Sequence, residues 1–205
     1  MIILFKQMKF IATLSEKVIR WMAFLTFLLV APSISAKIYM NQSEFLVLVS
    51  QHTSTEQFPN PEFKSKTIWL KKDIQSEIKS ILDHKYAKLR IRYKIDQKNN
   101  SPTTVWFLEE IGKERPISFG ISIKDDRVQM IRVLEFRESR GYEIHIPAFS
   151  KQFEQAGLNN DGKLDQNIDG ITGATMSVSA MKKMARLAIF LHQKVTTQLD
   201  HKNNK

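Results

Sequence analysis

The chain has 205 residues, which is enough for one domain with a sizeable core plus a leader segment. It contains no cysteine, and this excludes disulfides, zinc–thiolate sites, iron–sulfur clusters and a cysteine nucleophile. The formal net charge is +10, but the basic residues are scattered along the chain, so we expect no nucleic-acid partner.

Residues 1–36 have the pattern of a secretory signal peptide. The basic residues end at Arg20, an apolar run follows at 21–30, and small residues with Pro32 lead to Ala36. A membrane span needs about 20 apolar residues, so this run is short for one. We expect cleavage after Ala36 and a periplasmic mature protein. The alternative is an uncleaved leader that anchors the chain to the inner membrane.

The segment 37–84 is predicted to be an N-terminal helical extension. Residues 43–49 follow the pattern of a short helix with a serine at its start, and the polar, proline-containing stretch 51–61 indicates a loop. A second helix is predicted at 73–82, where apolar side chains recur on one helical face: Ile74, Ile78, Ile81 and Leu82.

Near residue 85 the hydrophobic period changes from 3.6 to 2, which is typical of half-buried strands. Strands are predicted at 89–95, 103–109, 117–123, 128–136 and 142–146. Because they follow one another without intervening helices, they indicate an antiparallel sheet and not a Rossmann fold.

The first of these strands carries the densest set of basic residues, which alternate along the chain: Lys88, Arg90, Arg92 and Lys94. A solvated sheet face accounts for this spacing most simply. A docking patch for an acidic partner or an anionic lipid is the alternative.

An apolar stripe at helical spacing predicts a last helix at 177–195, and a polar, flexible tail follows at 199–205. The expected fold class is therefore α+β: an antiparallel sheet, curved into a twisted half-barrel and flanked by helices. The domain that contains this sheet is placed at 85–198.

The loop that leads into the last helix is the most informative stretch. Gly170 and Gly173 permit positive φ angles and a close approach of a ligand to the backbone. Thr172, Thr175 and Ser177 supply hydroxyls, and either of the last two can cap the helix. A helix N-terminus favours a phosphate, so the loop is a candidate phosphate site. A capped helix with a tight entry turn is the alternative.

The letters of this loop, Asp169-Gly170-Ile171-Thr172-Gly173-Ala174-Thr175-Met176-Ser177, resemble the flavinylation motif of the FMN-binding domain family. That family includes flavin-carrying components of the sodium-pumping NADH:quinone oxidoreductase and of the Rnf electron-transport complex. The resemblance extends upstream to residues 104–114, 134–144 and 149–153. The resemblance implies that 85–198 is an FMN-binding domain.

The resemblance implies that FMN is the cofactor and that a phosphoester joins it to Thr175. It implies contact with the phosphate, or room for it, at Thr172, Gly173, Ala174 and Ser177. Asp169 and Gly170 would shape the loop or present it to the transferase. Glu138, Arg140 and Gly141 would lie near the flavin, or else form a bulged strand end with surface charges.

The partners implied are a flavin transferase, which takes FMN from FAD with the help of a divalent metal, and a membrane or periplasmic redox partner. We therefore expect an electron carrier and not a self-sufficient oxidoreductase. Two alternatives remain: a non-redox periplasmic binding or adaptor module, and a membrane-anchored subunit of a respiratory complex. Trp69 and Trp106 are candidates for stacking on the flavin, although a core or interface role is favoured.

Overall fold

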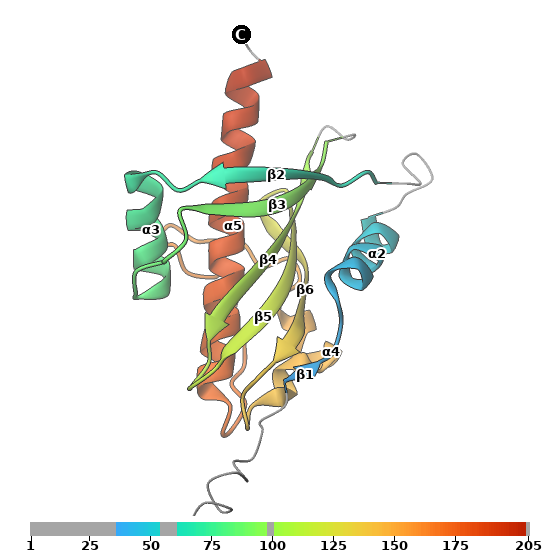
Figure 1. Cartoon of the computed structure of the whole chain (residues 1–205), viewed down its shortest axis with the longest axis vertical. Helices are drawn as coiled ribbons and strands as arrows, with labels where there is room; N and C mark the ends of the chain where they lie inside the picture. Colours follow the sequence, from blue (N-terminus) through green and yellow to red (C-terminus); the bar gives the residue numbers. More distant parts are fainter. Residues whose placement is uncertain (1–35, 54–60, 98–100, 204–205) are drawn as a thin grey trace, which may run out of the picture. The chain divides into compact units, whose positions relative to one another are not determined.

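The computed structural model describes residues 36–53, 61–97 and 101–203, all within one compact unit (Figure 1). The predicted signal peptide lies outside the described residues, apart from Ala36. The described chain forms one sheet with the strand order β1-β6-β5-β4-β3-β2, in which all neighbours are antiparallel. This confirms the predicted α+β class. No helix of the described residues is long and apolar enough to span a membrane.

The elements follow in chain order. The strands are β1 (Lys37–Ile38), β2 (Lys64–Trp69), β3 (Arg90–Asp96), β4 (Thr103–Ile111), β5 (Pro116–Lys124) and β6 (Arg127–Phe136). The helices are α2 (Gln42–Thr53), α3 (Lys72–Leu82), η1 (Tyr142–His145), α4 (Pro147–Ser150), η2 (Lys151–Phe153) and α5 (Thr175–Asn203).

The central sheet is a meander in which β3 to β6 follow one another as hairpins. The β5–β6 connection has only Asp125 and Asp126 between the strands, with φ angles of 53° and 58°. Two left-handed residues in a row are the mark of a type I′ turn, and aspartate tolerates this region better than most residues do. The strands predicted at 117–123 and 128–136 are thereby confirmed, and this turn joins them as a hairpin.

Both faces of the sheet are covered, by different helices. On β4, Trp106 and Leu108 point into the core that α5 and α3 share with the sheet. The alternate residues Val105 and Phe107 point to the opposite face and pack with Phe45 of α2. We call the face that carries α2 the outer face.

A glycine at the centre of β5 allows α2 to lie directly on the outer face. A Cβ atom at Gly120 would lie 2.8 Å from two ring carbons of Phe45. Phe45 is fully buried there. The sheet therefore needs glycine at this position because the aromatic ring rests on the backbone itself.

The structure corrects the predicted elements at three places. The segment 37–84 contains both predicted helices but also contributes β1 and β2 to the sheet. The stretch 142–146, predicted as a strand, forms the 3₁₀ helix η1, since Gly141 before it adopts a φ of 85° and turns the chain away from the sheet. The helix α5 begins at Thr175 and runs to Asn203, so residues 199–203 of the expected tail are helical.

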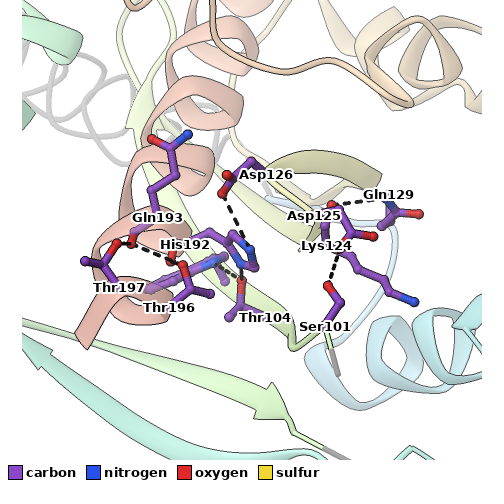
Figure 2. A network of polar contacts seen from close by, with 11 residues as sticks. Ser101, Thr104, Lys124, Asp125, Asp126, Gln129, His192, Gln193, Thr196 and Thr197 are labelled. Carbon is purple, nitrogen blue, oxygen red and sulfur yellow. Dashed lines mark hydrogen bonds and ion pairs between the residues drawn. The ribbon is translucent and has the colours of Figure 1, made fainter. Parts of the chain in front are cut away.

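A buried polar network joins α5 to the sheet (Figure 2). The Trp106 indole Nε1–H donates to Thr104 Oγ1 over 2.8 Å, and Thr104 Oγ1 lies 2.7 Å from His192 Nδ1. We assign the threonine proton to the bond with Nδ1, which leaves the imidazole N–H on Nε2, 3.8 Å from Asp126 Oδ1. Burial lowers the pKa of His192 to about 4, although Asp126 and Asp125 act in the opposite direction. The core thus holds His192 neutral.

Candidate functional site

A cavity of about 480 Å³ opens where three segments meet, and Figure 1 shows these segments at the lower end of the sheet. Its walls are the β4–β5 turn, the chain after β6 and the start of α5. In an antiparallel meander the β4–β5 turn and the last residues of β6 lie at the same end of the strands, so the topology brings these segments together. The lining residues are Lys113, Glu114, Glu138, Ser139, Arg140 and residues 173–177.

The start of α5 presents backbone donors to this cavity. The first helical bond runs from the Val178 N–H to the Ala174 oxygen, over 3.0 Å. The N–H groups of Thr175, Met176 and Ser177 therefore have no acceptor within the helix. The residue before the helix is Ala174, whose methyl group cannot accept a hydrogen bond, so the expected cap by Thr175 or Ser177 is wrong. These donors and the helix dipole suit an anion.

The turn before α5 depends on one glycine. The Ala174 N–H donates to the Ile171 oxygen over 2.9 Å, and Gly173 has a φ of 80°, as the third position of a type II turn requires. A Cβ atom at Gly173 would meet no atom within 4 Å, so the backbone is open to an approaching ligand. Gly170 does not adopt a positive φ.

The structure gathers four of the seven candidate residues at the cavity: Gly173, Ala174, Thr175 and Ser177. Thr175 is exposed, whereas Ala174 and Ser177 are buried. The other three, Asp169, Gly170 and Thr172, are exposed but do not line it. The Asp169 N–H donates to Gln152 Oε1 over 2.8 Å, which fixes the loop before the turn.

The chain after β6 touches the helix start through Gly141. A Cβ atom at this position would lie 2.5 Å from Ser177 Oγ and 3.3 Å from the Ala174 Cβ. Gly141 also has a φ of 85°, which disfavours any side chain. Glycine is therefore required here twice over, and the contact sets how closely the β6 segment approaches α5.

Glu138, in the chain after β6, binds the β4–β5 turn. Its Oε1 atom accepts hydrogen bonds from the N–H groups of Glu114, over 2.6 Å, and Arg115, over 2.9 Å. The same oxygen would lie 2.8 Å from a Cβ atom at Gly112. The carboxylate thus clamps the β4–β5 turn against the chain after β6, a role that the sequence did not predict.

Two cations border the cavity. Lys113 lies 3.9 Å from the neighbouring Glu114, and both side chains are largely exposed, so this pair is weak. Arg140 forms no ion pair with any residue that the structure describes. The sequence analysis gave no role to Lys113, although the meander topology could have pointed to the turn that carries it.

Neither candidate tryptophan lines the cavity. Trp106 is fully buried and stacks on Tyr93, with ring centroids 4.7 Å apart. It is a core residue. Trp69 is 60% exposed on β2, away from the α5 start.

Comparison with protein families gives one match. Residues 112–189 match the family model of the FMN-binding domain. The match begins at the clamped β4–β5 turn and ends within α5, so it contains all three walls of the cavity. Comparison with curated proteins finds no match.

The match indicates FMN as the cofactor, and the cavity residues fit it. The unpaired N–H groups of α5, with Lys113 and Arg140, are donors and charges suited to a phosphate. The cavity volume of about 480 Å³ is in the range of small-molecule sites. Bound FMN would supply one- and two-electron redox chemistry.

Proposed function

Because this chain carries an FMN-binding domain at residues 112–189, we propose that it is an exported electron carrier with FMN joined covalently to Thr175. One observation supports Thr175 as the attachment site. Thr175 is the first residue of α5, is exposed, and lines the cavity whose backbone donors and cations suit a phosphate.

The attachment is a transfer of FMN from FAD. Thr175 Oγ1 attacks the phosphorus on the FMN side of the pyrophosphate, a phosphoester bond forms, and the bond to the AMP phosphate breaks. AMP leaves and takes up the negative charge, while the hydroxyl proton passes to a base or to solvent. A flavin transferase with a divalent metal would supply this chemistry.

The geometry supports Thr175 over the neighbouring hydroxyls. Thr172 is exposed but lies outside the cavity, and Ser177 is buried against Gly141. Thr175 combines exposure with a place among the unpaired N–H groups. A flavin bound at an open surface would be accessible to a membrane or periplasmic redox partner, which supports the role of electron carrier. The leader pattern of residues 1–36 supports export.

The test is the intact mass of the protein after expression with a flavin transferase in an exporting host. We expect the mass of residues 37–205 plus FMN less one water. Thr175→Val should lose the flavin and keep the fold. Thr172→Val is the matched control, because it removes a threonine hydroxyl three residues before Thr175. This variant should retain the flavin.

Two outcomes contradict the proposal. Unmodified wild-type protein beside an active transferase excludes covalent attachment and favours a non-redox adaptor. A flavin that cannot be reduced and reoxidised reversibly in a spectroscopic titration excludes the electron carrier. A mass that retains the leader points to a membrane-anchored protein instead of a free periplasmic one.

A further inference from the structure

The outer face of β2 and β3 carries three basic side chains. Arg90, Arg92 and Lys94 alternate along β3, and the strand register sets them opposite Trp69, Thr67 and Ser65 of β2. The alternate residues of β3 point into the core on the other side. The three cations and Trp69 form what we call the basic face, which spans about 14 Å along the strand.

These cations differ from other basic residues of the domain. Arg127, Arg137 and Lys183 are each paired with a carboxylate. Among the residues that the structure describes, none pairs with a cation of the basic face. The Arg90 guanidinium instead lies 5.5 Å from the centre of the Trp69 ring, which is itself 60% exposed.

The composition of the face favours a membrane over a protein partner. A protein interface has an apolar core surrounded by a polar rim. The basic face has a single large apolar group, Trp69, beside the small hydroxyl side chains of Thr67 and Ser65. Tryptophan partitions to the membrane–water interface, and arginine and lysine bind anionic headgroups without a shaped pocket.

We propose that the basic face docks the protein onto an anionic lipid membrane. Figure 1 shows β2 and β3 at the upper end of the sheet and the start of α5 at the lower end. Docking through the basic face therefore leaves the FMN cavity free for a redox partner. The proposal does not depend on attachment of FMN, so it stands or falls separately from the proposed function.

The test is cosedimentation of the full-length protein with phosphatidylcholine vesicles, with and without phosphatidylglycerol. The triple variant Arg90→Gln, Arg92→Gln, Lys94→Gln should weaken binding to the anionic vesicles about 100-fold. A tenfold change in affinity corresponds to about 1.4 kcal/mol of binding free energy. The control Lys71→Gln, Lys72→Gln, Lys79→Gln removes the same charge from exposed positions of α3 and its start, and should bind nearly as the wild type does. Both variants keep the same leader, so their difference reports the basic face alone.

Tryptophan fluorescence gives a second readout. In a Trp21→Phe background, which leaves Trp69 and Trp106, anionic vesicles should shift the emission to the blue. Trp69→Phe should then remove that shift while leaving buried Trp106 unchanged. Equal binding of the two triple variants would overturn the proposal, as would equal binding to neutral and anionic vesicles. Absence of binding to any vesicle would also overturn it and direct attention to an acidic protein partner.

Discussion

The contact between Gly141 and the start of α5 can be measured with a series of glycine substitutions. Gly141 and Gly173 have nearly the same backbone angle, with φ of 85° and 80°. They differ in their surroundings, because a Cβ atom meets Ser177 Oγ at 2.5 Å at the first position and nothing within 4 Å at the second. The pair therefore separates backbone strain from packing.

Gly173→Ala should lower the free energy of unfolding by about 1 kcal/mol, since the left-handed penalty of about 1–2 kcal/mol is partly offset by a stiffer unfolded chain. Gly141→Ala adds overpacking of about 1–3 kcal/mol, for a total of about 2–4 kcal/mol. Ser177→Ala in the Gly141→Ala background removes the closest atom, and the next contact is 3.2 Å, so about 1–2 kcal/mol should return.

Urea unfolding, followed by the fluorescence of buried Trp106, measures these differences. Gly170→Ala is the control, because it has neither a positive φ nor a neighbour within 4 Å, and it should change stability by less than about 0.5 kcal/mol. If Gly141→Ala and Gly173→Ala cost the same within that margin, the β6 segment does not pack tightly on α5. The account of the cavity wall would then be wrong.

Two further predictions concern charged and titratable groups. The unfolded chain binds a proton at His192 with a pKa near 6.5 and the folded protein only near 4, so acidification across this window lowers the free energy of unfolding by up to about 3 kcal/mol. His192→Gln should flatten the pH dependence of urea stability between these values, and an unchanged slope would contradict the burial argument. Glu138→Ala should cost about 1–2 kcal/mol because two backbone N–H groups lose their acceptor, whereas Glu138→Gln, which keeps an oxygen, should cost less. Equal losses in urea for these two variants would show that the clamp depends on charge.

The sequence predicted those elements whose hydrophobic pattern matched their burial. In α3, Ile74, Ile78, Ile81 and Leu82 all lie in the core, as the helical spacing indicated. Strand β2 was missed because Ile68 is its only buried residue, as befits an edge strand. A single buried residue gives no apolar–polar alternation from which a strand could be predicted.

The site was predictable only in part. The loop 169–177 was identified from its sequence motif. Which of its residues line the cavity depends on where α5 begins, and helix ends are the least certain feature of a sequence pattern. Glu138 was expected near the flavin without a stated contact. Its bonds to the backbone of Glu114 and Arg115 join residues more than 20 positions apart, which local patterns do not encode.

The position of α5 after every strand has a consequence for synthesis. Trp106, Phe119 and Ile131 are buried on the face that α5 covers. A nascent chain that has completed β6 still lacks the long helix that covers most of this face, and exposed apolar sheet surface promotes aggregation. A chain that stops before Thr175 should therefore fail as a soluble product and not merely lose its cofactor. The residue proposed to carry the flavin thus begins the element on which the solubility of all the preceding strands depends.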